Sequence, residues 1–420
     1  MRRLLFFVSL GALMLAVACG GGGSSSSGNG TAAYPGILDS GSNGIYFLDT
    51  NTTGIPICSD DADFYCPSGT TSVSATNQGW YGSPSVGVSF SVANADNLFN
   101  TRNIAFNNLA GPSSGEFDFG LPFFFGRNVY TAIETKNTPG GIGPYFAYTG
   151  FSASTGSNVQ PIQVYSGPAY AASSNPDYIY TNGLFTSVTV CMPSAPSTCQ
   201  TITGVLVDTG SVGLRILSSA LTSIALPLEQ VGGNAVTECT EFMDGYTYGS
   251  VRTANVQLAG TSETASSVPI QLIGDPAYSS VPASCVSTGL VAETTLSALG
   301  ANAVLGVGPF LYDCDTGCTQ SVIGNPVIYY TCPSATGCTE SVIPQLQQQV
   351  TNPVALLPTD NNGVIIELPS ISSSGASVVN GFMVFGIGTA SNNGLNGATV
   401  FPLGSDANNF NTNGAFVTIY

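Results

Sequence analysis

The chain has 420 residues, a length that suits one large domain or two packed halves. It carries 7 Lys and Arg against 24 Asp and Glu and no histidine, which argues against nucleic acid as a partner and excludes serine–histidine catalysis. Charged residues make up only 7% of the chain, so few ion pairs would be lost in acid. A surface of neutral polar side chains is therefore expected to tolerate low pH.

The N-terminus has the layout of an export signal. Arg2 and Arg3 precede an apolar run that ends at residue 18, which predicts a signal peptide over residues 1–18. Small residues then precede Cys19, and this pattern predicts lipidation of that cysteine; the alternative is ordinary cleavage nearby with Cys19 incidental. Residues 19–30 predict a flexible Gly/Ser tether. We expect a lipid-anchored protein of the cell envelope, on the outer-membrane or periplasmic side, or a secreted one.

The rest of the chain favours an all-β fold with few short helices. Apolar and β-branched residues alternate between turn-forming clusters, and the clearest predicted strands are residues 185–192, 251–258 and 363–368. The best helical patterns cover residues 218–224 and 343–350. With 51 glycines and 25 prolines, long helices are not expected.

The 11 cysteines leave an even number once Cys19 is set aside, and an exported chain meets oxidising conditions. Short spacings predict local disulfides, and one long pair closes a larger loop. Zinc is the rival for the last group, but the chain has no histidine and no paired CxxC, and the connectivity in that group stays open. The predicted sets are Cys58 with Cys66, Cys191 with Cys199, Cys239 with Cys285, and the cluster of Cys314, Cys318, Cys332 and Cys338.

One motif occurs twice. Residues 38–45 read LDSGSNGI, and residues 207–214 read VDTGSVGL. A single copy could be an ordinary turn, because Asp, Ser and Gly are common in turns. Two copies that share an aspartate, a hydroxyl residue, a glycine, a serine, a second glycine and an aliphatic residue indicate an internal repeat.

The repeat predicts a pair of acids. A strand that ends in Asp39 or Asp208 and turns at a glycine can bring one carboxylate against the other. Two such groups hold one proton between them and titrate together, because ionising both would place like charges in contact. One can then act as base toward a water while the other donates a proton. This chemistry needs no cofactor and no metal.

These two motifs resemble the paired aspartate turns of pepsin-like aspartic peptidases. The resemblance implies a bilobal fold with pseudo-twofold lobes and hydrolysis of peptide bonds by a water activated between Asp39 and Asp208. The substrate would be a polypeptide in extended conformation, bound by a monomer. The resemblance also implies supporting roles: Ser40 and Thr209 bracing the turns, Ser42 and Ser211 bonding the outer carboxylate oxygens, and Gly41 and Gly210 allowing close approach.

Further segments resemble the same family. An apolar-apolar-glycine segment supports each aspartate turn in those enzymes, and residues 303–308 and 120–130 are similar to it, although the glycine of the second segment is placed imperfectly. Residues 242–251 resemble the flap hairpin that closes over substrate, with Tyr246 or Tyr248 as its tyrosine. An ordinary surface hairpin is the alternative.

The order of these segments is rotated relative to the family. Residues 382–388 resemble the start of the family's C-terminal lobe, yet they follow both aspartates. A circular permutation restores the usual order, with a first lobe from residues 151–355 and a second lobe from residues 31–150 and 356–420. Nearly the whole mature chain also resembles a little-characterised family of exported bacterial proteins with the same aspartate motifs.

Two other functions remain open. A non-catalytic cell-surface binding or adhesion protein could keep the same fold, although a binder needs no pair of acids. A glycosidase also uses two carboxylates, but it separates them, whereas these turns predict near contact. Contact with a membrane is expected only through the N-terminal lipid.

Overall fold

The computed structural model describes residues 32–113, 115–258, 262–322, 327–403 and 416–420. Strands account for 43% of the residues and helices for 11%, so the predicted all-β class is confirmed. The predicted signal peptide, Cys19 and the tether lie outside the described residues.

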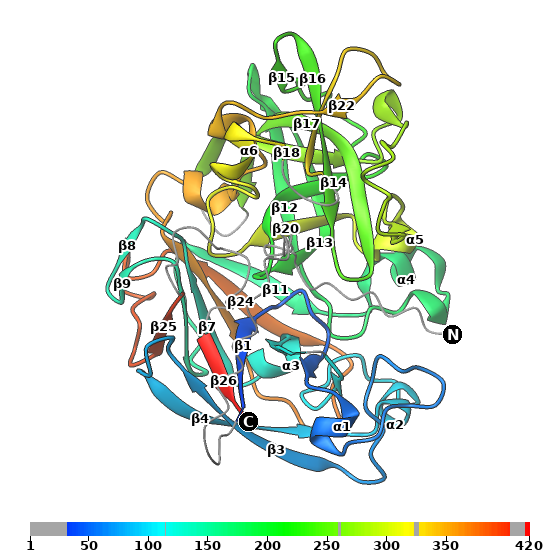
Figure 1. Ribbon diagram of the computed structural model, residues 1–420. Helices are drawn as coiled ribbons and strands as arrows, with labels where there is room; N and C mark the ends of the chain where they lie inside the picture. The colour runs from blue at the N-terminus through cyan, green and yellow to red at the C-terminus, as the bar shows by residue number, and fades with distance from the viewer. Residues whose placement is uncertain (1–31, 114, 259–261, 323–326, 404–415) are drawn as a thin grey trace.

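A seven-stranded sheet contains segments from both ends of the chain. Its strand order is β4-β3-β26-β1-β6-β2-β5. β26 pairs antiparallel with β1, with Ala33 opposite Ile419, and also pairs with β3 (Figure 1). The strands are β1 (Ala33–Leu38), β2 (Ile45–Phe47), β3 (Thr71–Gln78), β4 (Ser85–Val92), β5 (Ala110–Gly111), β6 (Phe117–Phe119) and β26 (Phe416–Ile419).

The other long strands form one large connected network, and β8 (Asn137–Thr138) and β9 (Gly141–Ile142) form a small separate ribbon. Within this network β7 pairs with β23 and β10 pairs with β25, so these pairings join residues 31–150 to residues 356–420. The strands are β7 (Arg127–Ala132), β10 (Tyr145–Gly150), β11 (Val159–Val164), β12 (Leu184–Met192), β13 (Ala195–Asp208), β14 (Val212–Leu217), β15 (Gln230–Val231), β16 (Asn234–Glu241), β17 (Gly245–Leu258), β18 (Thr264–Ile273), β19 (Val291–Ala292), β20 (Ala303–Val307), β21 (Tyr329–Cys332), β22 (Thr339–Glu340), β23 (Gly363–Leu368), β24 (Val379–Phe385) and β25 (Thr399–Pro402).

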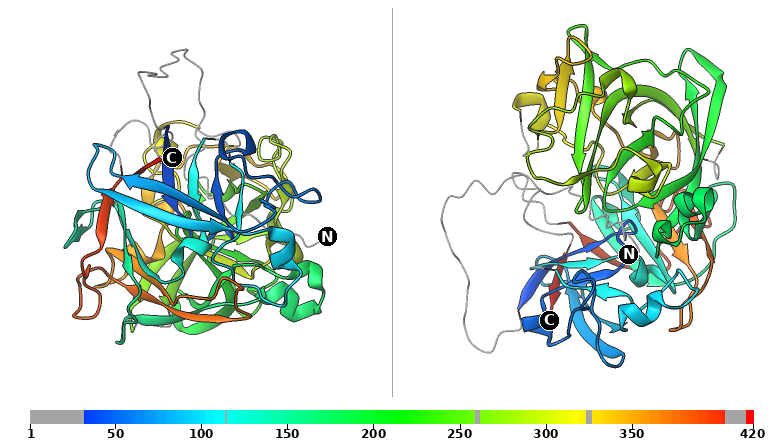
Figure 2. Two further views of the ribbon diagram at one scale, coloured as in Figure 1. Left: turned by 90° about the horizontal axis from the view of Figure 1, so that it is seen from below. Right: turned by 90° about the vertical axis from the view of Figure 1, so that its right-hand side faces the viewer.

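The elements gather in two halves of the molecule. In Figures 1 and 2 the green and yellow elements, such as β14 to β18, occupy one half, and the blue and red ones, such as β1, β3 and β26, occupy the other. β11 lies between them, because it pairs with β24 on one side and with β12 on the other.

The predicted strands are confirmed as β12, the second part of β17 and β23. β12 shows why alternation succeeds, because Val188 and Val190 are buried while Thr189 between them is only partly buried. In the first sheet Phe47, Phe117 and Phe119 stack at centroid distances of 5.5 and 5.7 Å and form the aromatic centre of the core.

The six α-helices among the described residues are all short, and α4 is the longest. Glycines in the left-handed conformation end α1 and α5, at Gly54 and Gly300. The α-helices are α1 (Thr50–Thr53), α2 (Ala95–Phe99), α3 (Leu121–Phe124), α4 (Gly167–Ser173), α5 (Leu296–Leu299) and α6 (Gly317–Gln320). The 3-10 turns are η1 (Pro176–Tyr178), η2 (Pro276–Tyr278), η3 (Leu346–Gln348) and η4 (Pro353–Leu356).

The two predicted helices were placed wrongly. Residues 218–224 form no helix: the Thr222 and Ser223 amides, which a helix would pair with residues 218 and 219, donate instead to Gln200 Oε1. Residues 343–350 contain only the turn η3, and the Val350 amide donates to the Tyr329 hydroxyl at 2.7 Å. Tertiary hydrogen bonds thus replaced the helical ones that local periodicity suggested.

Five disulfides confirm the reading of the cysteines as an oxidised framework. The open cluster resolves into two short loops, and the four sulfurs are consumed without metal ligation. The pairs are Cys58–Cys66, Cys191–Cys199, Cys239–Cys285, Cys314–Cys318 and Cys332–Cys338. Such a set fits a protein that folds outside the reducing cytoplasm.

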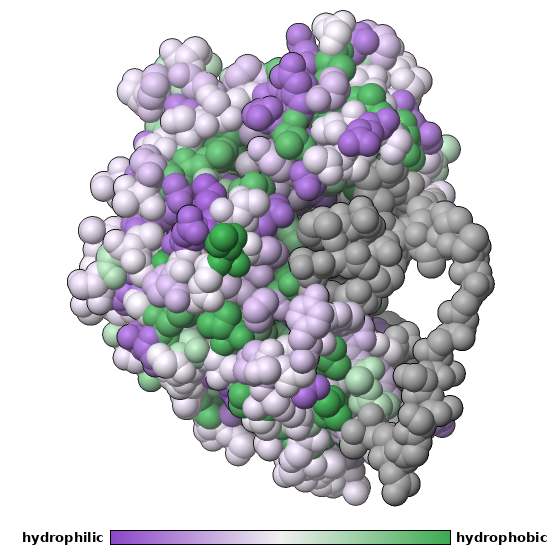
Figure 3. Space-filling model, turned by 60° about the vertical axis from the view of Figure 1, so that its left-hand side comes forward, coloured by the Kyte–Doolittle hydropathy of each residue, from purple (hydrophilic) through white to green (hydrophobic). Residues whose placement is uncertain are grey.

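The surface is mixed in character. On the face drawn in Figure 3, apolar residues are scattered among polar ones. Within the described ranges, no helix combines the length and apolar character needed to cross a bilayer.

Candidate active site

The two repeated motifs occupy matching places in their sheets. Asp39 follows β1, which pairs parallel with β6 so that Leu38 lies opposite Phe119. Asp208 ends β13, which pairs parallel with β20 so that Val207 lies opposite Leu305. After each turn the chain returns antiparallel along the same partner, as β2 along β6 and as β14 along β20. Each aspartate turn therefore sits at the end of a strand that has a hydrogen-bonded neighbour on either side, β26 and β6 for β1, and β12 and β20 for β13.

The turns are locked together by reciprocal hydrogen bonds. The Ser40 amide donates to Thr209 Oγ1 at 2.9 Å, and the Thr209 amide donates to Ser40 Oγ at 3.0 Å. Ser40 Oγ in turn donates to the Val207 carbonyl at 2.8 Å, and Thr209 Oγ1 donates to the Leu38 carbonyl at 2.9 Å. Each hydroxyl thus accepts from and donates to the opposite strand, which is the bracing arrangement expected for these two residues.

Glycine makes the close approach possible. A Cβ added at Gly41 would lie 2.6 Å from Asp208 Oδ1, and one added at Gly210 would lie 2.5 Å from Asp39 Cγ. Each glycine amide also donates to its own aspartate at 2.8 Å, Gly41 to Asp39 and Gly210 to Asp208. The structure therefore places the two carboxyls against each other with no room for a side chain between them.

The surroundings of Asp39 raise its pKa. Burial, followed by the charge of Asp208 and then that of Asp118, raises the pKa of Asp39 well above its ordinary value, and a hydrogen bond with Asp208 adds to this rise. Both aspartates are fully buried. This environment therefore favours the neutral form of Asp39.

The serines of the two motifs are not equivalent. Ser42 Oγ donates to Asp39 Oδ2 at 3.1 Å, as expected. The prediction for Ser211 is not met, because its buried hydroxyl has no hydrogen-bond partner among the described residues. The outer oxygen of Asp208, Oδ2, likewise has no partner there. Asp39 therefore has a serine donor on its outer oxygen, whereas Asp208 has none among the described residues.

The supporting glycines are Gly306 and Gly120. Gly306 lies opposite Asp208, and a Cβ there would lie 2.6 Å from the Val212 amide nitrogen. For the first turn, a Cβ at Gly120 would lie 2.9 Å from Ser42 Cβ. Gly126 instead packs against Ser370, so the supporting segment begins before residue 120 and includes β6.

That correction brings in Asp118, which sequence reasoning missed. Asp118 is the middle residue of β6, lies opposite Tyr46 and is fully buried. Burial raises its pKa well above the usual range, the nearby Ser42 hydroxyl lowers it somewhat, and the charges of Glu116 and Asp208 raise it again. An aspartate between two core phenylalanines was the available signal in the sequence.

The hairpin expected as a flap forms between β16 and β17, with Glu241 opposite Tyr246. Neither Tyr246 nor Tyr248 contacts an aspartate of the pair through any hydrogen bond of the described residues, and both are buried. Tyr248 donates instead to Thr237 Oγ1 at 3.1 Å.

Another tyrosine is closer to the acids in electrostatic terms. Burial raises the pKa of Tyr180, with further contributions from Asp244, Glu293, Asp208 and Asp39 in that order. Asp244 belongs to the turn of the hairpin, and Tyr180 shares a core cluster with Phe242 of that same turn. Tyr180, missed by sequence reasoning, therefore links the acid pair to the hairpin turn.

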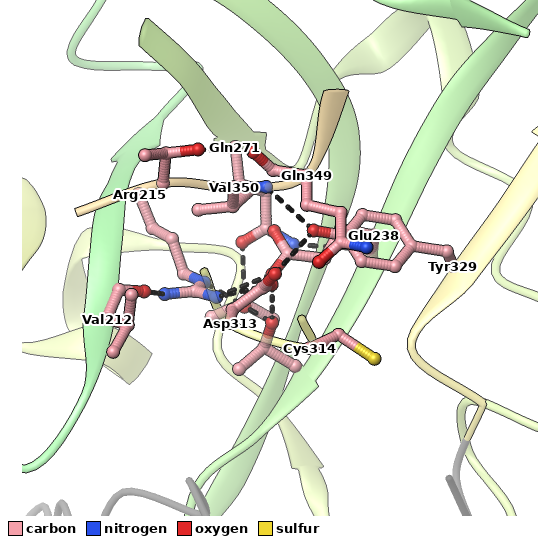
Figure 4. Close-up of polar contacts among 12 residues, drawn as sticks. Val212, Arg215, Glu238, Gln271, Asp313, Cys314, Tyr329, Gln349 and Val350 are labelled. Atoms are coloured by element: carbon pink, nitrogen blue, oxygen red, sulfur yellow. Dashed lines mark hydrogen bonds and ion pairs between the residues drawn. The ribbon is translucent and has the colours of Figure 1, made fainter. Parts of the chain in front are cut away.

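A buried ionic cluster supports the second motif from the far side of β14. Arg215 Nη2 lies 2.5 Å from Glu238 Oε1 and 3.3 Å from Asp313 Oδ2, as drawn in Figure 4. Tyr329 donates to Asp313 Oδ1 at 2.7 Å. Burial would lower the pKa of Arg215, but the two carboxylates more than offset this and raise it. The cluster fixes β14 behind the turn that holds Asp208.

Metal ligands are not assembled at the acid pair. The grouping of possible ligands in the described part of the chain is Cys58, Cys66 and Asp96, and its two sulfurs form a disulfide.

Comparison with curated proteins finds no match to this sequence. A family model, by contrast, matches residues 20–148 and 154–418, which together include both aspartate motifs. The chain thus belongs to the family described as "Protein of unknown function (DUF3443)".

Proposed function

We propose that the protein is an exported aspartic endopeptidase of the pepsin-like type. The observation that carries this proposal is the pair of buried carboxyls, Asp39 and Asp208, held against each other by the Ser40 and Thr209 hydrogen bonds. An ordinary turn needs no reciprocal hydrogen bonds to a second motif far away in the sequence. Such bonds are what a pair of acids needs if the two are to share one proton.

The raised pKa of Asp39 supports its role as the acid, with Asp208 as the base. Asp208 accepts a proton from a water, whose oxygen attacks the carbonyl carbon of the scissile peptide bond. Asp39, which retains the shared proton, donates it to the carbonyl oxygen. The tetrahedral intermediate then collapses: Asp208 gives the proton that it took from water to the leaving nitrogen, and the C–N bond breaks. Asp39 takes back a proton from a hydroxyl of the intermediate, which becomes the product carboxyl and restores the starting pair. No cofactor enters the balance.

Access to the acids requires movement. Asp39 and Asp208 are fully buried, so an extended polypeptide reaches them only when neighbouring residues shift. The hairpin turn at residues 242–244 is the natural moving part, because Phe242 packs in the cluster that contains Tyr180. Met243 at this turn is about half exposed, as a residue that contacts substrate would be.

Peptide cleavage between pH 2 and pH 7 tests the proposal. We expect Asp39→Asn and Asp208→Asn each to lower kcat by about 10²–10⁴-fold or more, because each removes one proton-transfer group without changing shape. A transition-state-mimicking aspartic-peptidase inhibitor should block the wild type. The matched control is Asp96→Asn, an exposed acid on α2, which should leave kcat within about twofold of wild type.

Retention of activity by either variant of the pair, or cleavage that ignores the inhibitor, contradicts the assignment. A wild type that cleaves none of a varied peptide library, yet binds peptide equally well with and without Asp39→Asn, supports the alternative of a non-catalytic cell-surface binding or adhesion protein.

We also propose a lipid anchor at Cys19 and a pepsin-like bilobal arrangement in which residues 151–355 form one lobe. The five disulfides support export. The strand pairings β1–β26, β7–β23 and β10–β25 support grouping residues 31–150 with residues 356–420. Mass spectrometry of the mature N-terminus, with Cys19→Ala as control, tests the anchor.

A further inference from the structure

We infer that Asp118 is a positioning residue of the acid pair: its negative charge, set beside Ser42 and Asp39, keeps the shared proton on Asp39 and so leaves Asp208 as the base. This inference rests on the proposed function, since it concerns how the same site assigns its acid and its base.

Strand register places Asp118 under the first aspartate turn and gives the second turn no counterpart. Asp118 lies opposite Ile37 of β1 and Tyr46 of β2. The corresponding residue of β20 is Val304, which lies opposite Leu206 of β13 and Arg215 of β14. The two turns are therefore built on the same pairing pattern, with an acid on one side and an aliphatic residue on the other.

No described residue neutralises this acid. Asp118 is fully buried, the Ser42 hydroxyl is the hydrogen-bonding neighbour that acts on it, and none of the ion pairs found among the described residues includes it. A buried carboxyl without a cation beside it is costly to ionise, so Asp118 is neutral in acid and becomes charged only as the pH rises.

Asp118 acts on Asp39 through the single hydroxyl proton of Ser42. The Ser42 hydroxyl has one proton, which it donates to Asp39 Oδ2 at 3.1 Å, yet it also lies near enough to lower the pKa of Asp118. When Asp118 ionises, two carboxylates compete for that proton. Any share that turns to Asp118 is lost to Asp39, which makes ionisation of Asp39 harder.

Direct repulsion acts in the same direction. The charge of Asp118 raises the pKa of Asp39, after burial and the charge of Asp208. The groups that face Asp118 are Ser42, Asp39, Asp208, Glu116 and Tyr46, and none of them is a cation. Both effects therefore hold the proton on Asp39 once Asp118 is charged.

The pH profile of kcat/KM tests this. We expect Asp118→Asn and Asp118→Val to match wild type within about threefold at the acid end, where Asp118 is neutral. Their alkaline limb should fall at a pH lower by roughly one unit, because Asp39 loses its proton earlier. Asp118→Val places in β6 the residue type found at Val304. It therefore shows whether an effect of Asp118→Asn comes from the new amide group and not from loss of the charge.

Glu116→Gln is the matched control. Glu116 precedes β6 and acts on Asp118 through its charge, but its hydrogen bond is to Ser113 and not to Ser42. We expect its alkaline limb within about 0.3 pH units of wild type. A limb that stays at the wild-type pH in both Asp118 variants, or that shifts equally in Glu116→Gln, overturns the inference.

A readout without catalysis separates the two hypotheses. Carboxyl carbons of ¹³C-labelled aspartate are titrated by NMR in wild type and Asp118→Asn, with Asp39 assigned from Asp39→Asn. The midpoint of Asp39 should fall by roughly one pH unit when Asp118 is replaced. If the wild type cleaves no peptide, the proposed function fails, and this titration alone decides the inference: an unchanged midpoint refutes it.

Discussion

The surroundings of the two aspartate turns differ although their strand pairing is the same. On the side of Asp208, the residue after the turn that faces β20 is Arg215, and it is compensated by Glu238 and Asp313. On the side of Asp39, the matching residue is the neutral Tyr46, and it faces the uncompensated Asp118. Pairing thus fixes the backbone of both turns, while the side chains beneath decide where charge and protons reside.

Both of these side chains reach back to the residue three positions earlier. Tyr46 donates to Asn43 Oδ1 at 2.5 Å, and Arg215 Nη1 donates to the Val212 carbonyl at 2.6 Å. Only Arg215 is part of an ionic cluster. Mutation of Arg215 is therefore expected to lower the free energy of unfolding more than mutation of Tyr46.

The largest effect is expected at Arg215. Arg215→Met leaves Glu238 and Asp313 buried without their cation, and should lower the free energy of unfolding by about 3–5 kcal/mol. Tyr46→Phe removes one neutral hydrogen bond and should cost about 1–2 kcal/mol. Urea denaturation of both variants measures the difference. Equal losses would mean that the ionic cluster contributes nothing specific behind the second turn.

The locking hydroxyls should have an intermediate effect. Ser40→Ala and Thr209→Val each remove a hydroxyl that donates one buried hydrogen bond and accepts another, with an expected cost of about 1–3 kcal/mol each. Since the two residues belong to one network, the double variant should lose less than the sum of the single ones. A double-mutant cycle by thermal unfolding provides the measurement, and strict additivity would show that the turns are not coupled.

The pH dependence of stability should give the smallest effect for each pH unit, at most about 1.4 kcal/mol for each group. Burial raises the folded-state pKa of Asp118, so its full contribution is present below about pH 3.9, the unfolded value, and is lost as the pH rises through the folded value. The wild type should therefore be more stable at pH 4 than at pH 7. The melting temperature of Asp118→Asn should change less than that of the wild type between pH 4 and pH 7. An equal change in the two proteins would contradict the raised pKa of Asp118.

Sequence patterns identified the features that depend on nearby residues. Alternation located β12 and β23, spacing located the short disulfides, and the repeated motif located both aspartates. These signals are local, so no knowledge of the rest of the fold was needed to interpret them.

What the sequence could not reveal depends on contacts between distant segments. The phenylalanines on either side of Asp118 indicate a buried segment, but only the register of β6 against β1 and β2 places this acid beneath the first aspartate turn. Residues 218–224 have helical periodicity, but the Ser218 amide donates to the Ile273 carbonyl, and the Thr222 and Ser223 amides donate to the Gln200 side chain. Ser211 repeats the position of Ser42 and yet lacks its hydrogen bond, which no motif can indicate.

The place of β26 has a consequence for how the molecule is made. β1, which leads into Asp39, has β26 on one side and β6 on the other. Its pairing is therefore incomplete until residues 416–419 are available. Closing so long a loop is slow compared with local folding. The first aspartate is consequently brought into its final geometry only after residues 416–419 have paired with β1, so the acid pair is completed late in folding.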